Sequence, residues 1–227
     1  MSHSLSPRLH NAAFAALGLD YVYVPLPVRG EDVGAAVLGL AALGFRGANV
    51  TIPHKAAVIP FLDEISEDAR LADAVNTITV EGGHLHGYNT DVEGVRGALV
   101  AAAGDTFAGE PALVTAGVPG ARCGWLALSD LTAGDVRRQT VVVNATSLGM
   151  AGEGKVPALL ADNVTAGQVV FDAVYASVLT DFLVTAQAAG AIVVDGLTML
   201  LGQAAEAFSL WTGVPAPLEV MRDAVRR

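Results

Sequence analysis

Apolar residues change their spacing several times along the first half of the chain. They recur every three or four positions in Leu9–Leu17 and Asp32–Leu43, which predicts helices, and they alternate in Phe45–Ile52, which predicts a strand. Further expected elements are a strand at Tyr21–Val24, a helix at Val58–Ala72, a hairpin of Val75–Val80 and Leu85–Tyr88 around Gly82-Gly83, and a helix at Val92–Ala102. Strands that alternate with helices favour an α/β layered fold.

The second half of the chain begins after the turn-forming pair Gly104-Asp105. Its expected elements are strands at Val141–Val143, Val169–Phe171 and Ala191–Val194, a helix at Leu179–Ala189 and a last helix at Thr198–Trp211. Continuously apolar strands separated by helices are typical of a parallel sheet covered on both faces. Because we expect the last helix to return to the first domain, we predict one domain from residues 1–92 with 199–227 and a second from residues 93–198.

Composition narrows the class of protein. The apolar fraction of 52% in 227 residues is ample for a packed core, and the longest apolar run, Gly34–Phe45, is too short to cross a bilayer. A net charge of -10 repels nucleic acid and anionic membranes, so neither is an expected partner. With no secretory signal ahead of Ser4 and Cys123 as the single cysteine, we expect a cytoplasmic protein, as monomer or homodimer.

Polar residues gather in four separate segments. They are His3–Asn11, with two serines before a proline; Gly47–Lys55, with the sequence Gly-Ala-Asn-Val-Thr-Ile-Pro-His-Lys; Ala74–Ile78; and Gly87–Asp91. The apolar alternation before Pro53 would place Lys55 at the lip of a sheet, where its amine can reach a bound small molecule. Taken alone, a lysine such as Lys55 more often merely solvates the start of a helix.

Together, these four segments resemble the shikimate dehydrogenase family, whose substrate domain carries HSxSPxxHN, NVTxPxK, AVNT and GxNTD in this order. The resemblance implies a substrate-binding α/β domain followed by a Rossmann-like NADP-binding domain. It also implies an oxidoreductase of the shikimate pathway, which leads to chorismate and the aromatic amino acids. The reaction would be the reversible, NADPH-dependent reduction of 3-dehydroshikimate to shikimate.

The resemblance also implies roles for particular residues. Lys55 would exchange the proton of the reacting oxygen and Asp91 would pair with it, which suits a lysine held by a carboxylate. The implied substrate contacts are Ser4, Ser6, Thr51, Asn76, Asp91, Tyr175 and Gln203. The implied cofactor contacts are Glu67, Asn144, Ala145, Thr146, Ala173, Gly196 and Met199.

Some of these residues also have a purely structural alternative. Asp91 could only cap the following helix, and Ser4 and Ser6 could form a capping arrangement. Tyr175 could be a half-buried strand end, since the chain continues with Ala-Ser-Val where the family has a proline-containing stretch. Histidines 54 and 86 lack further ligands at metal-binding spacing, so no metal site is expected.

The sequence departs from the family in one region. Neither the glycine-rich phosphate loop nor the Asn-Arg-Thr segment of the family stands between Glu110 and Thr140, a span too short for the elements expected there. Leu113–Arg122 resembles the end of a helix entering a strand, and no strand precedes the first motif. We therefore expect an incomplete dinucleotide-binding domain in a chain that omits pieces of the natural protein. The alternatives are a quinate/shikimate dehydrogenase that uses NAD and a non-catalytic shikimate-binding module.

Overall fold

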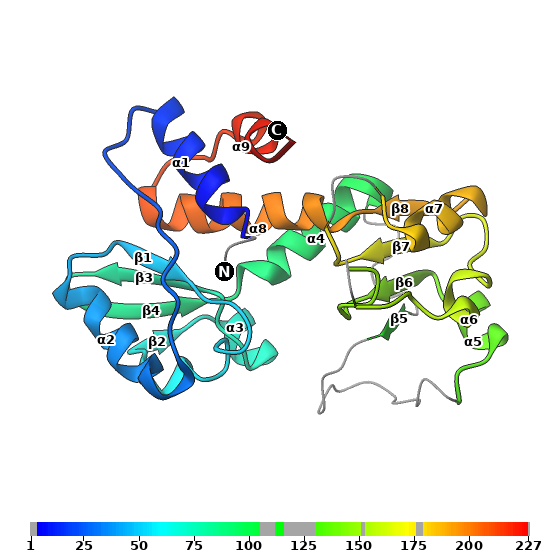
Figure 1. The fold of residues 1–227 in the computed structure, drawn as a ribbon, viewed down its shortest axis with the longest axis horizontal. Coiled ribbons are helices and arrows are strands. Elements are labelled where there is room, and N and C mark those ends of the chain that lie inside the picture. The colour runs from blue at the N-terminus through cyan, green and yellow to red at the C-terminus, as the bar shows by residue number, and fades with distance from the viewer. Residues whose placement is uncertain (1–3, 105–111, 116–129, 151–152, 176–178, 227) are drawn as a thin grey trace. The chain divides into compact units, whose positions relative to one another are not determined.

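The computed structural model describes residues 4–104, 112–115, 130–150, 153–175 and 179–226. The chain divides into two compact units, one of Met1–Gly94 with Leu201–Arg227 and one of Val95–Leu200. The elements of the first unit (Figure 1) are helices α1 (Ser6–Ala16), α2 (Val33–Ala42), α3 (Glu67–Ala72) and α9 (Leu218–Arg226), 3₁₀ turns at Gly30–Asp32 and Ile59–Phe61, and strands β1 (Gly47–Asn49), β2 (Glu64–Ile65), β3 (Thr77–Glu81) and β4 (His84–Tyr88). Two long helices, α4 (Thr90–Ala103) and α8 (Gly196–Thr212), contain residues of both units.

The sheet of the first unit has the strand order β1-β3-β4-β2. Strands β3 and β4 form the predicted antiparallel hairpin, with Val80 opposite Leu85. The turn between them uses Gly82 and Gly83 at φ 59° and 89°, in the left-handed region that glycine adopts without steric cost. The hairpin prediction is confirmed, and β1 pairs antiparallel with β3 on its other side.

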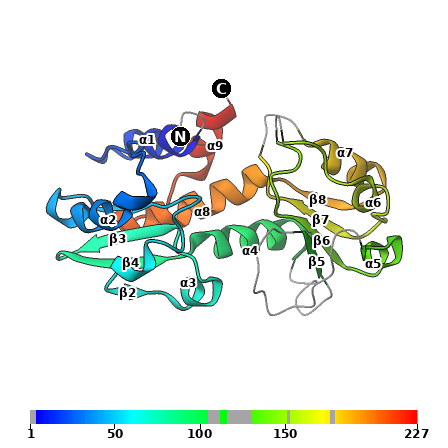
Figure 2. The same ribbon diagram turned by 60° about the horizontal axis from the view of Figure 1, so that its bottom comes forward.

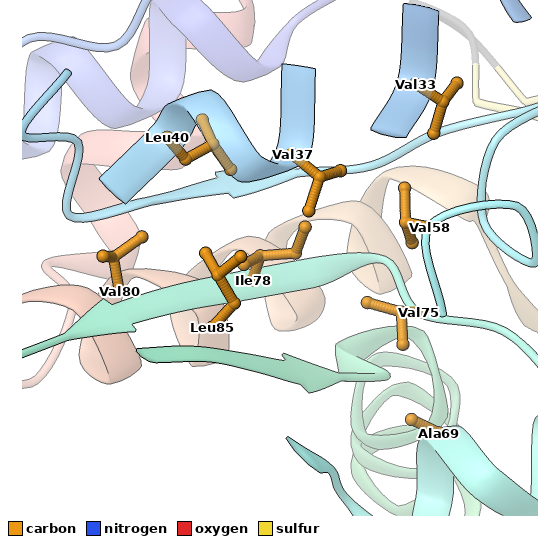
Figure 3. Close-up of a cluster of buried hydrophobic side chains, with 9 residues drawn as sticks. All are labelled: Val33, Val37, Leu40, Val58, Ala69, Val75, Ile78, Val80 and Leu85. Carbon is orange, nitrogen blue, oxygen red and sulfur yellow. The ribbon is translucent and has the colours of Figure 1, made fainter. Parts of the chain in front are cut away.

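Helix α2 buries its apolar stripe on one face of this sheet. Figure 3 shows Val33, Val37 and Leu40 of the helix directed toward the strands, where Ile78 and Val80 stand in the same cluster. The three helix residues recur at intervals of four and three, which places them on one side of an α-helix. Removing this much apolar surface from water is the main stabilising term for the unit.

Helix α8 approaches the same sheet very closely at Gly47. The indole Nε1 of Trp211 donates to the carbonyl oxygen of Ile78 at 2.9 Å. A Cβ at position 47 would lie 2.1 Å from that oxygen and 2.3 Å from the indole nitrogen, so only glycine fits. In Figures 1 and 2 the helices α1 and α9 lie side by side, so the C-terminal segment completes the first unit.

The second unit holds a four-stranded parallel sheet in the order β5-β6-β7-β8. Its elements are strands β5 (Ala112–Thr115), β6 (Val141–Asn144), β7 (Val169–Asp172) and β8 (Ile192–Val194) and helices α5 (Ala133–Arg137), α6 (Ala158–Ala161) and α7 (Asp181–Ala188). Val142 and Val170 pack into one core cluster with Leu160 and Phe182, while Val141 and Val169 belong to another with residues of α4. The predicted parallel sheet with two covered faces is confirmed.

Several expected elements differ from the structure. The strand predicted at Tyr21–Val24 is wrong, because the backbone of Tyr23 bonds to the side chain of Asn11 instead of to a neighbouring strand. The continuous helix predicted over Val58–Ala72 is also wrong, because β2 interrupts it by pairing with β4. Helix α9 was not predicted.

The region where the sequence departs from the family is described only in part. Residues 112–115 form strand β5 and not the end of a helix, so that part of the prediction is wrong. The rest of Leu113–Arg122, from residue 116 on, lies outside the described residues, as does most of the segment in which the phosphate loop was expected.

Candidate active site

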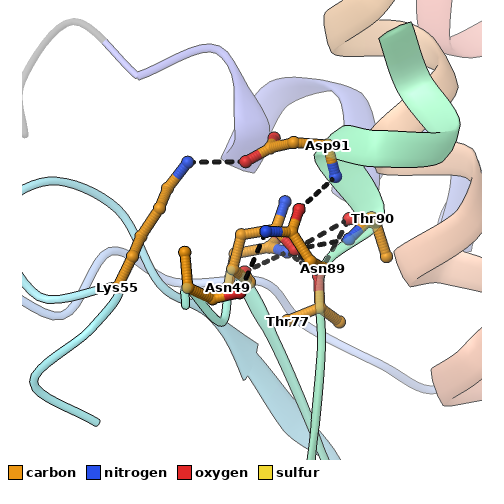
Figure 4. A network of polar contacts seen from close by, with 8 residues as sticks. Asn49, Lys55, Thr77, Asn89, Thr90 and Asp91 are labelled. Atoms are coloured by element: carbon orange, nitrogen blue, oxygen red, sulfur yellow. Dashed lines mark hydrogen bonds and ion pairs between the residues drawn. The ribbon is translucent and has the colours of Figure 1, made fainter. Parts of the chain in front are cut away.

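An ion pair joins two residues that lie 36 positions apart in the chain. Lys55 Nζ donates to Asp91 Oδ2 at 2.6 Å, and the two side chains are 29% and 25% exposed. Lys55 follows β1 in a turn whose Ile52–Pro53 peptide bond is cis, and its carbonyl oxygen accepts the N–H of Val75 at 2.8 Å. Figure 4 shows its side chain reaching across to the start of α4. An ammonium group held by a carboxylate and open to solvent can deliver a proton to a ligand and recover it from water.

Asp91 does not cap helix α4, so that alternative for its role is wrong. Asn89, one residue ahead of the helix, accepts the N–H of Asp91 through Oδ1 at 3.1 Å and donates to the carbonyl oxygen of Ala74 at 2.9 Å. Asn89 therefore satisfies the exposed amide at the helix start. The carboxylate of Asp91 is left to bond Lys55.

Asn76 also holds the start of α4, through its side-chain oxygen. Its Oδ1 accepts the N–H of Thr90 at 2.7 Å and the Thr90 hydroxyl at 3.1 Å, and it also accepts the hydroxyl of Thr77. Asn76 is only 3% exposed, so its amide oxygen is committed to positioning α4. The structure gives this predicted substrate contact a clear positioning role beside the ion pair.

A cavity of about 170 Å³ opens in the first unit. Ser4 and Thr51, both predicted substrate contacts, line it together with Tyr23, Asn49 and His54, and its remaining wall is largely apolar. Ser4 Oγ accepts the N–H of Ser6 at 3.4 Å, while the N-cap residue of α1 is Leu5, which makes no side-chain cap. Asn49 has no predicted role, although it stands inside the same nine-residue motif as Lys55.

His10 lies fully buried beside this wall, in a cluster of aromatic rings. Its ring stacks on Tyr23 with centroids 4.7 Å apart and an interplanar angle of 9°. Phe14, Phe208 and Trp211 surround it, and neither ring nitrogen has a hydrogen-bond partner among the described residues. Burial lowers the pKa of His10 from 6.5 to about 4, so the imidazole is neutral at pH 7.

The predicted cofactor contacts of the second unit gather at the carboxyl ends of its strands, where parallel sheets bind their ligands. Asn144 ends β6, and its amide nitrogen donates to Leu148 O and to Asp172 Oδ1, each at 2.9 Å. Its Oδ1 accepts from the backbone and the hydroxyl of Thr146. The Asn144 side chain therefore shapes the loop, in which Ala145 is exposed.

Three more of these contacts take part in packing. Gly196 opens α8, where a Cβ would lie 2.5 Å from the carbonyl oxygen of Ala173. Ala173 and Met199 pack against the core cluster that contains Val141 and Phe171. The three residues bring the loop after β7 and the start of α8 together, which fits one wall of a dinucleotide site.

The remaining predicted residues, Glu67, Tyr175 and Gln203, stand in three different environments. Glu67 pairs with Arg70 on exposed α3, and this partner lowers the pKa of Glu67. Tyr175 follows β7 with 41% of its surface exposed. Gln203 lies buried on α8 within the first unit.

The described residues contain neither a metal-ligand cluster nor a membrane-spanning helix. No group of three or more histidine, cysteine, aspartate or glutamate side chains there could hold a metal ion. None of the helices in that part of the chain has the length and apolar character needed to traverse a bilayer.

Comparison with known proteins places both ends of the chain in known domain families. Residues 1–78 match the shikimate dehydrogenase substrate binding domain, and residues 196–226 match the shikimate 5′-dehydrogenase C-terminal domain. The shikimate dehydrogenase (NADP(+)) of Salinibacter ruber is 41% identical, over all of this chain and 94% of the relative. That of Citrifermentans bemidjiense is 40% identical, over 99% of this chain and 91% of its own.

A solved structure agrees with these relatives. The shikimate 5-dehydrogenase of Thermus thermophilus, in complex with NADP(H) and shikimate, superposes with a TM-score of 0.84 and 32% identity, over all of this chain and 95% of that one. The alignment with the Salinibacter protein extends over 267 positions, whereas this chain has 227 residues, so 40 positions have no counterpart here.

Proposed function

The chain belongs to the shikimate dehydrogenase family, and we propose how its own residues carry out the reaction of that family. The resemblance seen in the four motifs is confirmed. The chain is an NADP-dependent oxidoreductase of the shikimate pathway, and its reaction interconverts shikimate and 3-dehydroshikimate. The observation that supports the assignment of residues is the ion pair between Lys55 and Asp91.

Lys55 is the group that moves the proton. When shikimate is oxidised, its reacting carbon loses a hydride and its hydroxyl loses a proton, which Lys55 accepts in its neutral form. In the reverse direction the Lys55 ammonium returns this proton to the oxygen as negative charge develops there. Asp91 holds the ammonium in place and stabilises its charge, and the solvent exposure of the pair allows exchange with water.

The substrate binds at the cavity of the first unit. Ser4 and Ser6 supply hydroxyl donors for the carboxylate of shikimate, which the overall negative charge of the protein would otherwise repel. Thr51 and Asn76 are assigned to the ring hydroxyls, and Gln203 and Tyr175 complete the proposed contacts. The substrate domain is then residues 1–92 with 199–227, which nearly coincides with the first compact unit.

The second unit, residues 93–198 in our assignment, holds the cofactor. When bound, NADP supplies the acceptor and donor of the hydride. Ala145 and Thr146 present the loop after β6, which Asn144 fixes, and Ala173, Gly196 and Met199 form the adjoining wall. Glu67 is the only proposed contact from the first unit. We also propose a cytoplasmic protein that acts as a monomer or homodimer.

The test is the initial rate of shikimate-dependent NADP⁺ reduction, with quinate and NAD⁺ as alternative substrates. We expect Lys55→Met to lower kcat by about 100- to 10,000-fold, the usual contribution of general acid–base catalysis. KM should change little, because the lysine acts mainly on the reacting oxygen in the transition state.

The chain supplies a matched control in its only other lysine. Lys155 also forms an ion pair, to Asp181 at 2.9 Å, but both side chains are more than four-fifths exposed. Lys155→Met should therefore retain the wild-type rate. A Lys55→Met protein that keeps kcat within about tenfold of wild type would refute the role of Lys55.

A further inference from the structure

Asn49 has an amide whose orientation is decided by its neighbours. Its Nδ2 donates to the backbone oxygen of Asn76 at 3.3 Å and to the Thr77 hydroxyl at 3.0 Å. A backbone carbonyl can only accept, so the nitrogen must face Asn76 and the oxygen must point the other way. Figure 4 shows Asn49 close to Thr77, beneath the start of α4.

The oxygen of this amide receives the hydroxyl of Tyr23. Tyr23 Oη lies 3.0 Å from Asn49 Oδ1 and must donate, since that oxygen has no hydrogen to give. Both amide hydrogens and one of the two lone pairs of Asn49 are then used. One acceptor position remains on a residue that lines the cavity, which suits the hydroxyl hydrogen of a polyol ligand.

Asn11 and His10 hold Tyr23 in place. Asn11 grips its backbone by accepting the N–H at 2.7 Å and donating to the carbonyl oxygen at 2.9 Å. His10 stacks on the ring. Burial raises the pKa of Tyr23 to about 12 and outweighs the opposing effect of the Ser6 hydroxyl. The phenol is therefore a neutral donor at any physiological pH.

We propose that Tyr23 is a positioning residue for substrate binding, which orients Asn49 so that its free acceptor receives a ring hydroxyl of shikimate. Tyr23 does not touch the reacting atoms and acts through Asn49. The inference rests on the proposed function, because it assumes that the cavity side of the first unit binds the substrate. This role also explains two residues of the first motif. His10 stacks on the ring of Tyr23, and Asn11 makes backbone hydrogen bonds to Tyr23 of the kind that a neighbouring strand would make.

The first experiment compares wild type with Tyr23→Phe, which removes only the hydroxyl. Losing the bond that orients Asn49 should raise KM for shikimate by about 3- to 10-fold, and the Kd of shikimate measured by calorimetry should rise with it. The contact is made equally in ground and transition states, so kcat should stay within about twofold. A residue that mattered only for folding would instead lower the active fraction, and thus the apparent kcat, without changing KM.

Tyr21→Phe is the matched control, since it removes a phenol hydroxyl two residues away. The Tyr21 ring packs against Phe14, and its hydroxyl makes no hydrogen bond to any described residue. KM should be unchanged in this variant. In an Asn49→Ala background, Tyr23→Phe should raise KM by less than about twofold further, because the side chain through which Tyr23 acts is already missing.

The outcomes separate this inference from the proposed function. An active wild type with the same KM in Tyr23→Phe, or full additivity with Asn49→Ala, overturns the role of Tyr23 alone. A wild type that neither oxidises nor binds shikimate overturns the proposed function and this inference with it. KM does not depend on the concentration of folded enzyme, so partial unfolding of a variant does not obscure the result.

Discussion

The first unit should lose stability on mild acidification because of His10. The unfolded chain binds a proton at His10 with the ordinary pKa of 6.5, whereas the folded protein binds it only near pH 4. The folded-state pKa is the lower one, so the stabilising effect is complete above pH 6.5 and is lost as the pH falls toward 4. The full shift corresponds to about 3 kcal/mol, and the loss between pH 7.5 and 5.0 to about 2 kcal/mol.

The assay is urea unfolding followed by the fluorescence of Trp211, whose ring lies 5.2 Å from His10. The other tryptophan of the chain, at position 125, is replaced by phenylalanine so that the emission reports the first unit alone. His10→Phe keeps an aromatic ring in the stack and cannot titrate. We compare the unfolding free energies of two proteins that both carry Trp125→Phe, one with His10 and one with His10→Phe. Their difference should shift by about 2 kcal/mol from pH 7.5 to 5.0, since the contributions of all other titrating groups cancel.

An exposed histidine provides the comparison. The His84 side chain is 70% exposed, so His84→Gln changes a histidine outside the core and serves as the control variant in the same assay. A wild-type to His10→Phe difference that is the same at both pH values would refute the reasoning, because it would show that the folded protein does not disfavour the charged imidazole.

Two further substitutions test the framework of the site. Gly47→Ala should destabilise the first unit by about 2 to 4 kcal/mol in the same urea assay, because the new methyl group displaces the Trp211 indole from its bond to the sheet; unchanged stability would contradict that close approach. Asn89→Ala removes the cap of α4 and should cost about 1 kcal/mol while lowering kcat more than it raises KM, because the helix start carries the carboxylate that holds Lys55, the proposed proton donor; a rise in KM alone would contradict it.

Much of the site could be predicted from the sequence because its polar residues come in short motifs. The motifs predict that Lys55 and Asp91 form a pair, and in the structure their side chains lie 2.6 Å apart. The hairpin was predictable for a similar reason, since two adjacent glycines specify a tight turn that joins neighbouring strands. The parallel sheet followed from continuously apolar runs, which indicate strands buried on both faces.

The local sequence pattern predicted the wrong secondary structure where the hydrogen-bond partner of a segment lies far away in the chain. Val58–Ala72 was expected to be one helix, yet Glu64 and Ile65 pair with β4, and Gly87 of that strand lets the side chain of Leu62 pack within 2.5 Å of where a Cβ would stand. Tyr21–Val24 has the composition of a strand but no strand to pair with, so Asn11 takes the hydrogen-bonding position instead.

The sequence by itself thus determined which chemical groups the protein has and most of the elements that carry them, because motifs, turns and periodicity are local properties. Only the tertiary structure decided which of those groups bond to one another. Asn89 took the capping role and left Asp91 to Lys55, and Tyr23 became the partner of Asn49. These assignments depend on hydrogen-bond geometry between segments far apart in the chain, which no local pattern encodes.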